Sequence, residues 1–362
     1  PRRRWPPAID GGCLLGQDAG PASHLPRMSS IEFAASLQSA AETLLDRRAT
    51  PQALDLSCAA LFEVCAALSG GLDEQSSALA CGKALSSLEA ARCLLDHRRT
   101  TVLLRAVDAA IRARLQQKPG PICLLYAGCG PFATLILPLL ARYPAERLRV
   151  CLLDVHAQSL RCAEALCDAA GVADRLLPSL RGDAAQLRLP RGLRVDLLLA
   201  ELMQRALAHE PQLAVLMNLL PQCAPDVALV PARIRVSAAL ADIAREFEPD
   251  AERLRIELGE LVQLSQSSLP DLAARLANGR IDCPDVVIPR AIPQGLSLIL
   301  RTRIEASEVD VLADYDSGLT HPLVLHALGA LRGGERFACR YRLGSDPGFE
   351  LVRAEDAPPA DA

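Results

Sequence analysis

The sequence predicts an α/β fold with a parallel sheet, preceded by a helical region and followed by a β-rich, barrel-like domain. Residues 29–117 carry apolar residues three and four positions apart, as amphipathic helices do. Residues 118–236 alternate short apolar runs with helical segments, which predicts parallel strands with helices on both faces of the sheet. Residues 237–356 show partly alternating, strand-like stretches between turn signals, which predicts the β-rich domain.

The two ends of the chain are expected to lie outside these domains. Residues 1–28 are rich in Gly and Pro and lack a continuous apolar segment, so we expect a disordered leader and not a signal peptide. Met28 is a candidate start, which leaves open whether residues 1–27 belong to the native protein. Residues 357–362 are expected to form a disordered tail. With 362 residues, half of them hydrophobic, the chain is long enough for two domains.

The helical region begins with SSIE at 29–32, which reads as a capping box at the start of the first helix. Loops at 48–52 and 69–74 divide the helices that follow. The last helical stretch ends at KPGP, residues 118–121, where Pro and Gly cannot continue a helix.

The predicted parallel sheet contains five strand candidates. Helices are expected between them over residues 133–143 and 159–171. The strand candidates are ICLLYA (122–127), LRVCLLD (148–154), RLLPSLRGD (175–183), VDLLLAEL (195–202) and VALVPARIRV (227–236).

The β-rich domain is predicted from three stretches and one helical insertion. Turn signals rich in Gly, Pro and Asp separate the stretches. The stretches are IRVSAAL (234–240), LSLILRTRIEASEVDVLA (296–313) and GERFACRYRLG (334–344), and the insertion is SSLPDLAARLANG (267–279).

Composition excludes several classes of function. The net charge is −4 and aromatic residues make up only 3%, which argues against a nucleic-acid-binding protein. No uninterrupted apolar run reaches the roughly 18 residues of a membrane span, so we expect no membrane segment. The 13 cysteines are scattered, without a C-x-x-C pair, and are interpreted as reduced thiols of a cytoplasmic protein. No metal site is expected.

Polar residues follow three successive strand candidates. Gly128 and Gly130 come directly after the first strand, Asp154 ends the second, and Asp183 ends the third. Ligands of open α/β sheets bind beyond the carboxyl ends of the strands, where glycines let the backbone approach a ligand and an acid can accept both hydroxyls of a ribose. This order fits either a dinucleotide or S-adenosylmethionine, and the full G-x-G-x-x-G fingerprint of the first is absent.

Two glutamates, Glu201 and Glu210, flank the segment that follows the fourth strand candidate. They are nine residues apart, and nine steps of about 100° would point them to opposite sides of a straight helix. If they act together, the chain between them must fold back as a loop.

These motifs together resemble class I S-adenosylmethionine-dependent methyltransferases, which have a Rossmann-like parallel sheet, and among them the protein arginine methyltransferases. The resemblance covers roughly residues 85–340. It is carried by D-x-x-R-T in DHRRT (96–100), the glycine loop YAGCGP (126–131), the double-glutamate segment ELMQRALAHE (201–210), VALVPARI (227–234) and, more weakly, THP (320–322).

The resemblance implies S-adenosyl-L-methionine as cofactor. It places Tyr126 in the glycine loop with the two glycines, and it assigns the cofactor's carboxylate to Arg99. Asp154 and Asp183 would hold the ribose and an adenine edge.

The resemblance also implies the catalytic residues. Glu201 and Glu210 would clamp a planar guanidinium by charge-assisted hydrogen bonds and draw its positive charge toward one nitrogen, which activates the other. Asp96 and His321, which are distant in sequence, would meet near the clamp and relay a proton outward. The predicted substrate is a guanidino group of peptidyl arginine or of an arginine-like small molecule, and the resemblance also allows a homodimer.

The sequence departs from the family pattern at several motif positions. Tyr126 replaces an acid, Phe132 the third glycine, Leu202 a Trp, Gln212 a Met and Pro322 the Trp of the histidine motif. These changes favour a small-molecule acceptor slightly over a peptide.

Two alternative functions remain open. One is methyl transfer to an amine, hydroxyl or carbon in a biosynthetic pathway, and the other is a non-catalytic binding protein with a methyltransferase fold. The role of the helical segment 29–83, the number of methyl groups transferred and the oligomeric state are open as well.

Overall fold

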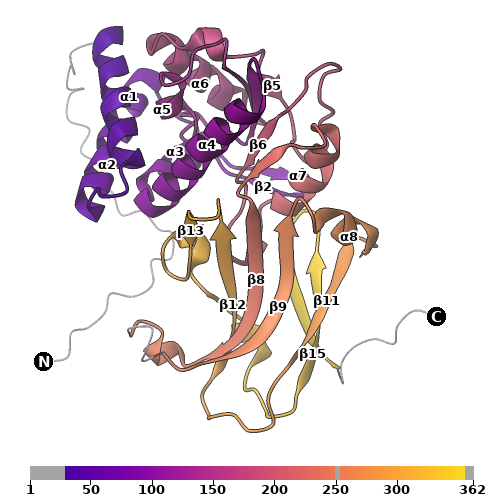
Figure 1. Cartoon of the computed structure of the whole chain (residues 1–362). Coiled ribbons are helices and arrows are strands. Elements are labelled where there is room, and N and C mark those ends of the chain that lie inside the picture. Colours follow the sequence, from indigo (N-terminus) through magenta and orange to yellow (C-terminus); the bar gives the residue numbers. More distant parts are fainter. Residues whose placement is uncertain (1–28, 249–252, 355–362) are drawn as a thin grey trace, which may run out of the picture.

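The structure is a computed structural model that describes residues 29–248 and 253–354, so the predicted leader and tail lie outside the described residues. Figure 1 shows a helical region and a parallel sheet at the top and a β-rich domain below. One hydrophobic core of mainly aliphatic side chains runs through both parts.

The N-terminal region is helical, as predicted. Helices α1 (Ser30–Leu45) and α2 (Pro51–Ser69) pack against each other and against α4 (His97–Gln117). The predicted capping box at Ser29 is present, because its side chain accepts from the backbone N–H of Glu32 and the Glu32 carboxylate accepts from the backbone N–H of Ser29.

Between α2 and α4 the chain forms a small hairpin that the sequence did not reveal. Strands β1 (Ser77–Leu79) and β2 (Gly82–Ala84) pair antiparallel, and the short helix α3 (Ser87–Arg92) follows. Three residues per strand are too few for a visible alternation of apolar and polar side chains, which is why the pattern escaped sequence analysis.

Helix α2 has the length and the apolar composition that a membrane-spanning helix would need. Within residues 29–248 and 253–354 it is the one helix with these two features, and 22% of the span is buried in the fold. In this structure α2 packs against α1, α4 and α6 (Ala157–Ala169).

The central sheet is five-stranded and parallel, with strand order β5-β4-β3-β6-β7. Helix α4 contacts β3, β6 and β7, α6 contacts β4, and α7 (Gln212–Leu219) contacts β6. The chain runs from β3 outward through β4 to β5 and then returns to β6 on the other side of β3. The strands are β3 (Ile122–Ala127), β4 (Leu148–Asp154), β5 (Leu180–Arg181), β6 (Leu197–Ala200) and β7 (Ala228–Val230).

Three predicted elements are shorter in the structure than the sequence pattern indicated, and one of them is the strand expected over 195–202, which is reduced to β6. The helix expected over 133–143 is reduced to α5 (Leu137–Leu140), because Pro138 can occupy only the first turn of a helix. The strand expected over 175–183 is reduced to the two residues of β5, and Pro178 precedes it in a stretch without regular structure.

The strand candidate at 227–236 divides between the two domains. Its first part is β7 of the parallel sheet, and after Pro231 the chain enters β8 (Arg233–Ala241) of an antiparallel sheet. The change from one sheet to the other therefore occurs at residues 231–232, slightly before position 236.

The second domain consists of two antiparallel sheets that contact each other through β9 and β11. The short helix α8 (Leu269–Ala274) lies within the predicted insertion at 267–279. One sheet contains β8, β9 (Arg255–Ser265), β12 (Ser297–Glu305), β13 (Val311–Leu312) and β14 (Leu323–Val324). The other contains β10 (Leu276–Ala277), β11 (Arg280–Val287), β15 (Arg336–Arg342) and β16 (Gly348–Arg353).

Candidate active site

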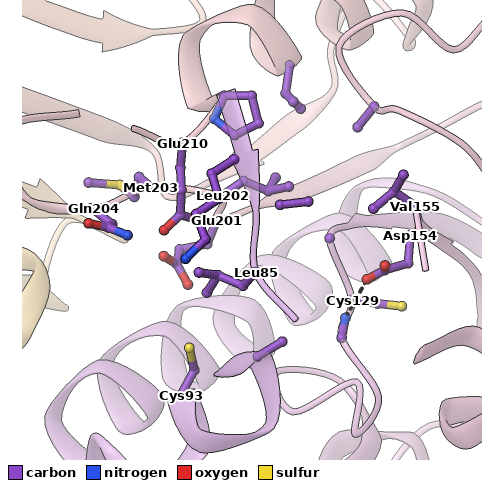
Figure 2. A pocket seen from close by; sticks show the side chains of 18 of the residues that line it. Leu85, Cys93, Cys129, Asp154, Val155, Glu201, Leu202, Met203, Gln204 and Glu210 are labelled. Carbon is purple, nitrogen blue, oxygen red and sulfur yellow. Dashed lines mark hydrogen bonds between the residues drawn. The ribbon is translucent and has the colours of Figure 1, made fainter. Parts of the chain in front are cut away.

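A cavity of about 380 Å³ lies at the carboxyl edge of the parallel sheet, next to the β-rich domain. Its wall comes from the segments that follow β3, β4, β5 and β6, from the β1–β2 hairpin, from the start of α4 and from the turn at 318–319. The order of the strands reverses at β3, and such switch points are where open α/β sheets bind ligands. Figure 2 shows the side chains that converge on the cavity.

The glycine loop after β3 has a backbone conformation that favours glycine at two positions. Gly128 and Gly130 adopt φ values of 69° and 62°, which favour glycine. A Cβ atom on Gly128 would lie 2.6 Å from Cδ2 of Leu202, so the backbone of the glycine loop runs close against the segment after β6.

Asp154 is held at the end of β4 by backbone donors. Its Oδ2 accepts from the N–H of Gly130 at 2.9 Å, a contact that Figure 2 shows, and its Oδ1 accepts from the N–H of His156 at 2.8 Å. Burial raises the pKa of Asp154, and these backbone hydrogen bonds oppose the rise. Each oxygen keeps a lone pair for a ligand hydroxyl, and Asp183, half-buried after β5, lines the same cavity.

The two bulky residues in the glycine loop are accommodated in different ways. Phe132, which replaces the third glycine, points toward the helical region and meets Phe62 of α2 edge to face at 5.7 Å. It is not among the residues that line the cavity, so it does not fill the ligand space. Tyr126 does line the cavity, and burial raises the pKa of its phenol well above the usual range.

Glu201 and Glu210 both line the cavity, and each is only 6% exposed. Burial raises the pKa of Glu210 to about 7, and the negative charge of Glu201 adds to the rise. A hydrogen bond from Gln204 and the positive charges of Arg99 and Lys83 oppose it. Figure 2 shows both side chains among those that line the cavity, and their joint action on a substrate stays a prediction.

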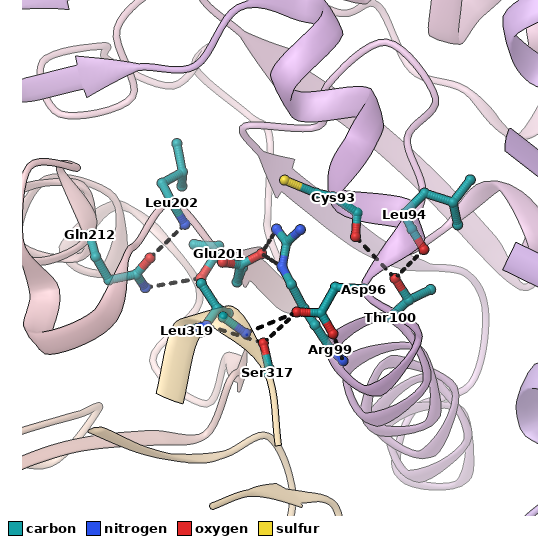
Figure 3. A network of polar contacts seen from close by, with 12 residues as sticks. Cys93, Leu94, Asp96, Arg99, Thr100, Glu201, Leu202, Gln212, Ser317 and Leu319 are labelled. Atoms are coloured by element: carbon teal, nitrogen blue, oxygen red, sulfur yellow. Dashed lines mark hydrogen bonds and ion pairs between the residues drawn. The ribbon is translucent and has the colours of Figure 1, made fainter. Parts of the chain in front are cut away.

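Arg99 forms a buried ion pair with Glu201 (Figure 3). Its Nε donates to Glu201 Oε2 at 2.8 Å, and its Nη2 contacts the same oxygen. Burial raises the pKa of Glu201, and the Arg99 guanidinium opposes that rise. The side chain expected to hold a cofactor carboxylate therefore also positions one of the two glutamates, a link that the sequence did not reveal.

We call residues 201–210 the clamp loop, because the chain folds back within it. Ala206, Leu207 and His209 adopt left-handed φ values of 54°, 53° and 65°. This conformation costs a non-glycine residue about 1–2 kcal/mol. Such strain persists only where the surrounding structure imposes it, and it clusters at functional sites.

Hydrogen bonds to residues outside the clamp loop hold this conformation, one of them from the backbone N–H of His209 to the carbonyl of Pro347 at 2.8 Å. The backbone N–H of Ala206 donates to Oγ1 of Thr302 in β12, and the Tyr341 hydroxyl of β15 donates to the carbonyl of Leu207, both at 2.7 Å. The backbone N–H of Lys83 in β2 donates to the carbonyl of His209 at 2.7 Å. The β-rich domain and the hairpin thus hold the loop on two sides.

Gln212 holds the exit of β6 in place. Its fully buried side chain accepts from the backbone N–H of Leu202 at 2.8 Å and donates to the carbonyl of Ala200 at 3.0 Å (Figure 3). Position 212, which departs from the family pattern, therefore fixes the backbone on either side of Glu201.

Asp96 and His321 are not brought together, which corrects the predicted relay. Asp96 caps α4 and accepts from the Ser317 hydroxyl at 2.7 Å and from the Gly318 N–H at 3.2 Å (Figure 3). His321 follows the turn at 318–320, is exposed, and packs on Tyr315 with ring centroids 5.4 Å apart. Gly318 and Leu319 of the turn line the cavity, and His321 is not among the lining residues.

Sequence reasoning missed several residues that line the cavity. Lys83 lies in the hairpin, and Gln204 and Arg205 lie inside the clamp loop. His156, two positions after Asp154, also lines the cavity, and its proximity in sequence could have marked it. The described residues contain no group of three or more His, Cys, Asp or Glu side chains arranged to hold a metal ion.

No protein-family model and no curated protein sequence matches the chain. Its structure matches 190 chains of solved structures, among them one in the PRMT1 enzyme–prozyme heterotetrameric complex of Trypanosoma brucei with AdoHcy. That match has 16% sequence identity and a TM-score of 0.50, and it covers 72% of this chain and 90% of the other. The comparison confirms the predicted architecture: the chain has the fold of an arginine methyltransferase, with a parallel-sheet domain followed by a β-rich domain.

Proposed function

We propose that the protein is an S-adenosylmethionine-dependent N-methyltransferase that acts on a guanidino group. One observation carries this proposal. Two buried carboxylates, Glu201 and Glu210, belong to a loop that folds back on itself, and both face the cavity formed by the glycine loop. Two carboxylates are costly to bury side by side, so a cationic ligand that neutralises them is the chemistry that this arrangement favours.

The residues around the cavity fit the proposed cofactor. Gly128 and Gly130 offer backbone close to the ligand space, and Asp154 keeps acceptor capacity for ribose hydroxyls. Asp183 lines the same cavity and would hold an adenine edge. The cavity volume of about 380 Å³ lies in the range of small-molecule sites. S-adenosylmethionine, when bound, would supply an electrophilic methyl carbon on a sulfonium.

The ion pair between Arg99 and Glu201 is compatible with both of their proposed roles. Both contacts from Arg99 go to Oε2 of Glu201, through Nε and Nη2. No described residue donates a hydrogen bond to Oε1, so this oxygen remains for a substrate N–H. The Nη1 of Arg99 is not used in the ion pair and remains for the cofactor's carboxylate. Arg99 would thus hold Glu201 in one orientation and bind the cofactor at the same time.

The carboxylates would orient and activate the acceptor. Glu201 and Glu210 each accept from an N–H of the guanidinium and draw its charge to the nitrogens that they contact. The remaining nitrogen would form the new N–C bond as the S–C bond breaks, and one proton leaves that nitrogen. Glu210, whose pKa is raised to about 7, is suited to take this proton at neutral pH.

Mass spectrometry tests the proposal directly. The protein would be incubated with S-adenosylmethionine and, separately, with L-arginine and an arginine-rich peptide. We expect a gain of at least one methyl group on a guanidino nitrogen, and a loss of at least about 100-fold in rate for Glu201→Gln and Glu210→Gln. Glu164→Gln, which changes an exposed glutamate on α6, is the matched control. Turnover that survives both clamp changes would favour an amine, hydroxyl or carbon acceptor.

We also propose a cytoplasmic location and self-association. All twelve described cysteines are free thiols, which suits a reducing compartment. The matched chain of Trypanosoma brucei is part of a heterotetrameric complex, and this supports testing the present chain for a homodimer by sedimentation.

A further inference from the structure

Arg205 is a cation at the cavity for which the structure provides no partner. It lines the cavity and is exposed, and across residues 29–248 and 253–354 its guanidinium makes no hydrogen bond or ion pair. Two other cations of the cavity wall are neutralised, Arg99 by Glu201 and Lys83 by Glu89 at 3.3 Å. Arg205 is thus a basic side chain in the cavity wall whose charge can pair with a ligand.

The backbone next to Arg205 in the clamp loop is fixed by hydrogen bonds. The next residue, Ala206, is fixed by its hydrogen bond to Thr302, and the N–H of Leu207 donates to the carbonyl of Gln204 at 3.0 Å. The charge therefore stands on a constrained turn between the two clamp glutamates, and its long side chain is free to adapt.

The distribution of charge separates two classes of acceptor. Glu201 and Glu210 attract a guanidinium into the cavity, whereas Arg205 at the exposed part of the wall repels further positive charge. An arginine-rich peptide would bring several such charges to this rim, and a small guanidino acid would bring a carboxylate. Arginine side chains bind carboxylates by paired, charge-assisted hydrogen bonds.

We propose that the acceptor is a guanidino carboxylic acid, with its guanidinium between Glu201 and Glu210 and its carboxylate on Arg205. This inference rests on the proposed function and adds the substrate class. Arg205 would act in specificity: it binds the end of the substrate that does not react, and so it affects KM more than kcat.

The test compares L-arginine with L-argininamide, which differ in the negative charge at the end remote from the guanidinium. With saturating S-adenosylmethionine, kcat/KM would be measured for the wild type, Arg205→Ala and Arg205→Lys. Arg245→Ala is the matched control, since Arg245 is also exposed but lies in the β-rich domain and does not line the cavity. Calorimetry with S-adenosylhomocysteine would be run on each variant.

We expect the wild type and Arg245→Ala to prefer L-arginine by about tenfold or more, which corresponds to about 1.4 kcal/mol. Arg205→Ala should lose this preference through a higher KM for L-arginine, and Arg205→Lys should keep part of it. Affinity for S-adenosylhomocysteine should not change.

Three results would overturn the inference. If guanidines are methylated but the wild type does not discriminate, or Arg205→Ala discriminates equally well, the substrate class is wrong and the proposed function survives. If Arg205→Ala loses affinity for S-adenosylhomocysteine, Arg205 serves the cofactor. If the wild type binds S-adenosylhomocysteine and methylates no guanidine, the proposed function fails and the inference fails with it.

Discussion

Replacing Glu210 with Gln should stabilise the protein above neutral pH while it removes activity. Burial and the nearby Glu201 raise the pKa of Glu210 from 4.5 to about 7 in the folded state. A carboxyl group with a raised pKa stabilises the fold fully below about pH 4.5, and that contribution is lost as the pH rises through about 7. A shift of about 2.5 units corresponds to about 3 kcal/mol, because one unit is worth about 1.36 kcal/mol.

Urea unfolding of the wild type and of Glu210→Gln between pH 4 and pH 8.5 measures this difference. The variant should be more stable by about 3 kcal/mol at pH 8 and about equal to the wild type near pH 4. Glu164→Gln should follow the wild type at every pH. The reasoning is refuted if Glu210→Gln is no more stable than the wild type at pH 8, or if any gain is the same at all pH values.

Three further changes test how the site is held together. Arg99→Ala should lower the free energy of unfolding by about 3–5 kcal/mol, because it leaves Glu201 buried without its partner, and adding Glu201→Gln should restore most of that loss in urea unfolding. Gly128→Ala should weaken the binding of S-adenosylhomocysteine, measured by calorimetry. An alanine there is strained by about 1–2 kcal/mol, and its Cβ would lie 2.6 Å from Leu202. Normal affinity would contradict the proposed role of the glycine loop. Thr302→Val should lower the free energy of unfolding by about 1–3 kcal/mol, because the buried backbone N–H of Ala206 in the clamp loop loses its acceptor. It should also lower kcat and leave cofactor affinity unchanged. An unaltered kcat would argue against strain imposed from β12.

Features that depend on neighbouring strands were predictable from the sequence. The carboxyl ends of parallel strands share one edge of the sheet, so residues after successive strands meet whatever the helices between them do. This is why Gly128, Asp154 and Asp183 line one cavity as expected. The return of the chain between Glu201 and Glu210 was expected on the condition that the two act together, since a straight helix would separate them.

Features that depend on contacts between distant segments were not predictable. The position of the turn at 318–320 relative to α4 is set by how the β-rich domain packs, so sequence could not tell that Ser317, and not His321, reaches Asp96. The same holds for Phe132, whose partner Phe62 comes from the N-terminal helices. Phe132, which departs from the family pattern, is explained by its packing against α2.

The second role of Arg99 was hidden for a related reason. The resemblance implied a contact with the cofactor only, and Glu201 lies 102 residues further along the chain. Only the folded arrangement of α4 against the end of β6 shows that Arg99 forms an ion pair with Glu201.

Calorimetric titration of the S-adenosylhomocysteine-bound protein with L-arginine tests the clamp most directly, since it does not depend on turnover. We predict that the wild type binds L-arginine, and that the variant carrying both Glu201→Gln and Glu210→Gln binds S-adenosylhomocysteine but loses L-arginine binding. Equal binding of L-arginine by the wild type and this variant would contradict the central claim that these two carboxylates recognise the guanidino group.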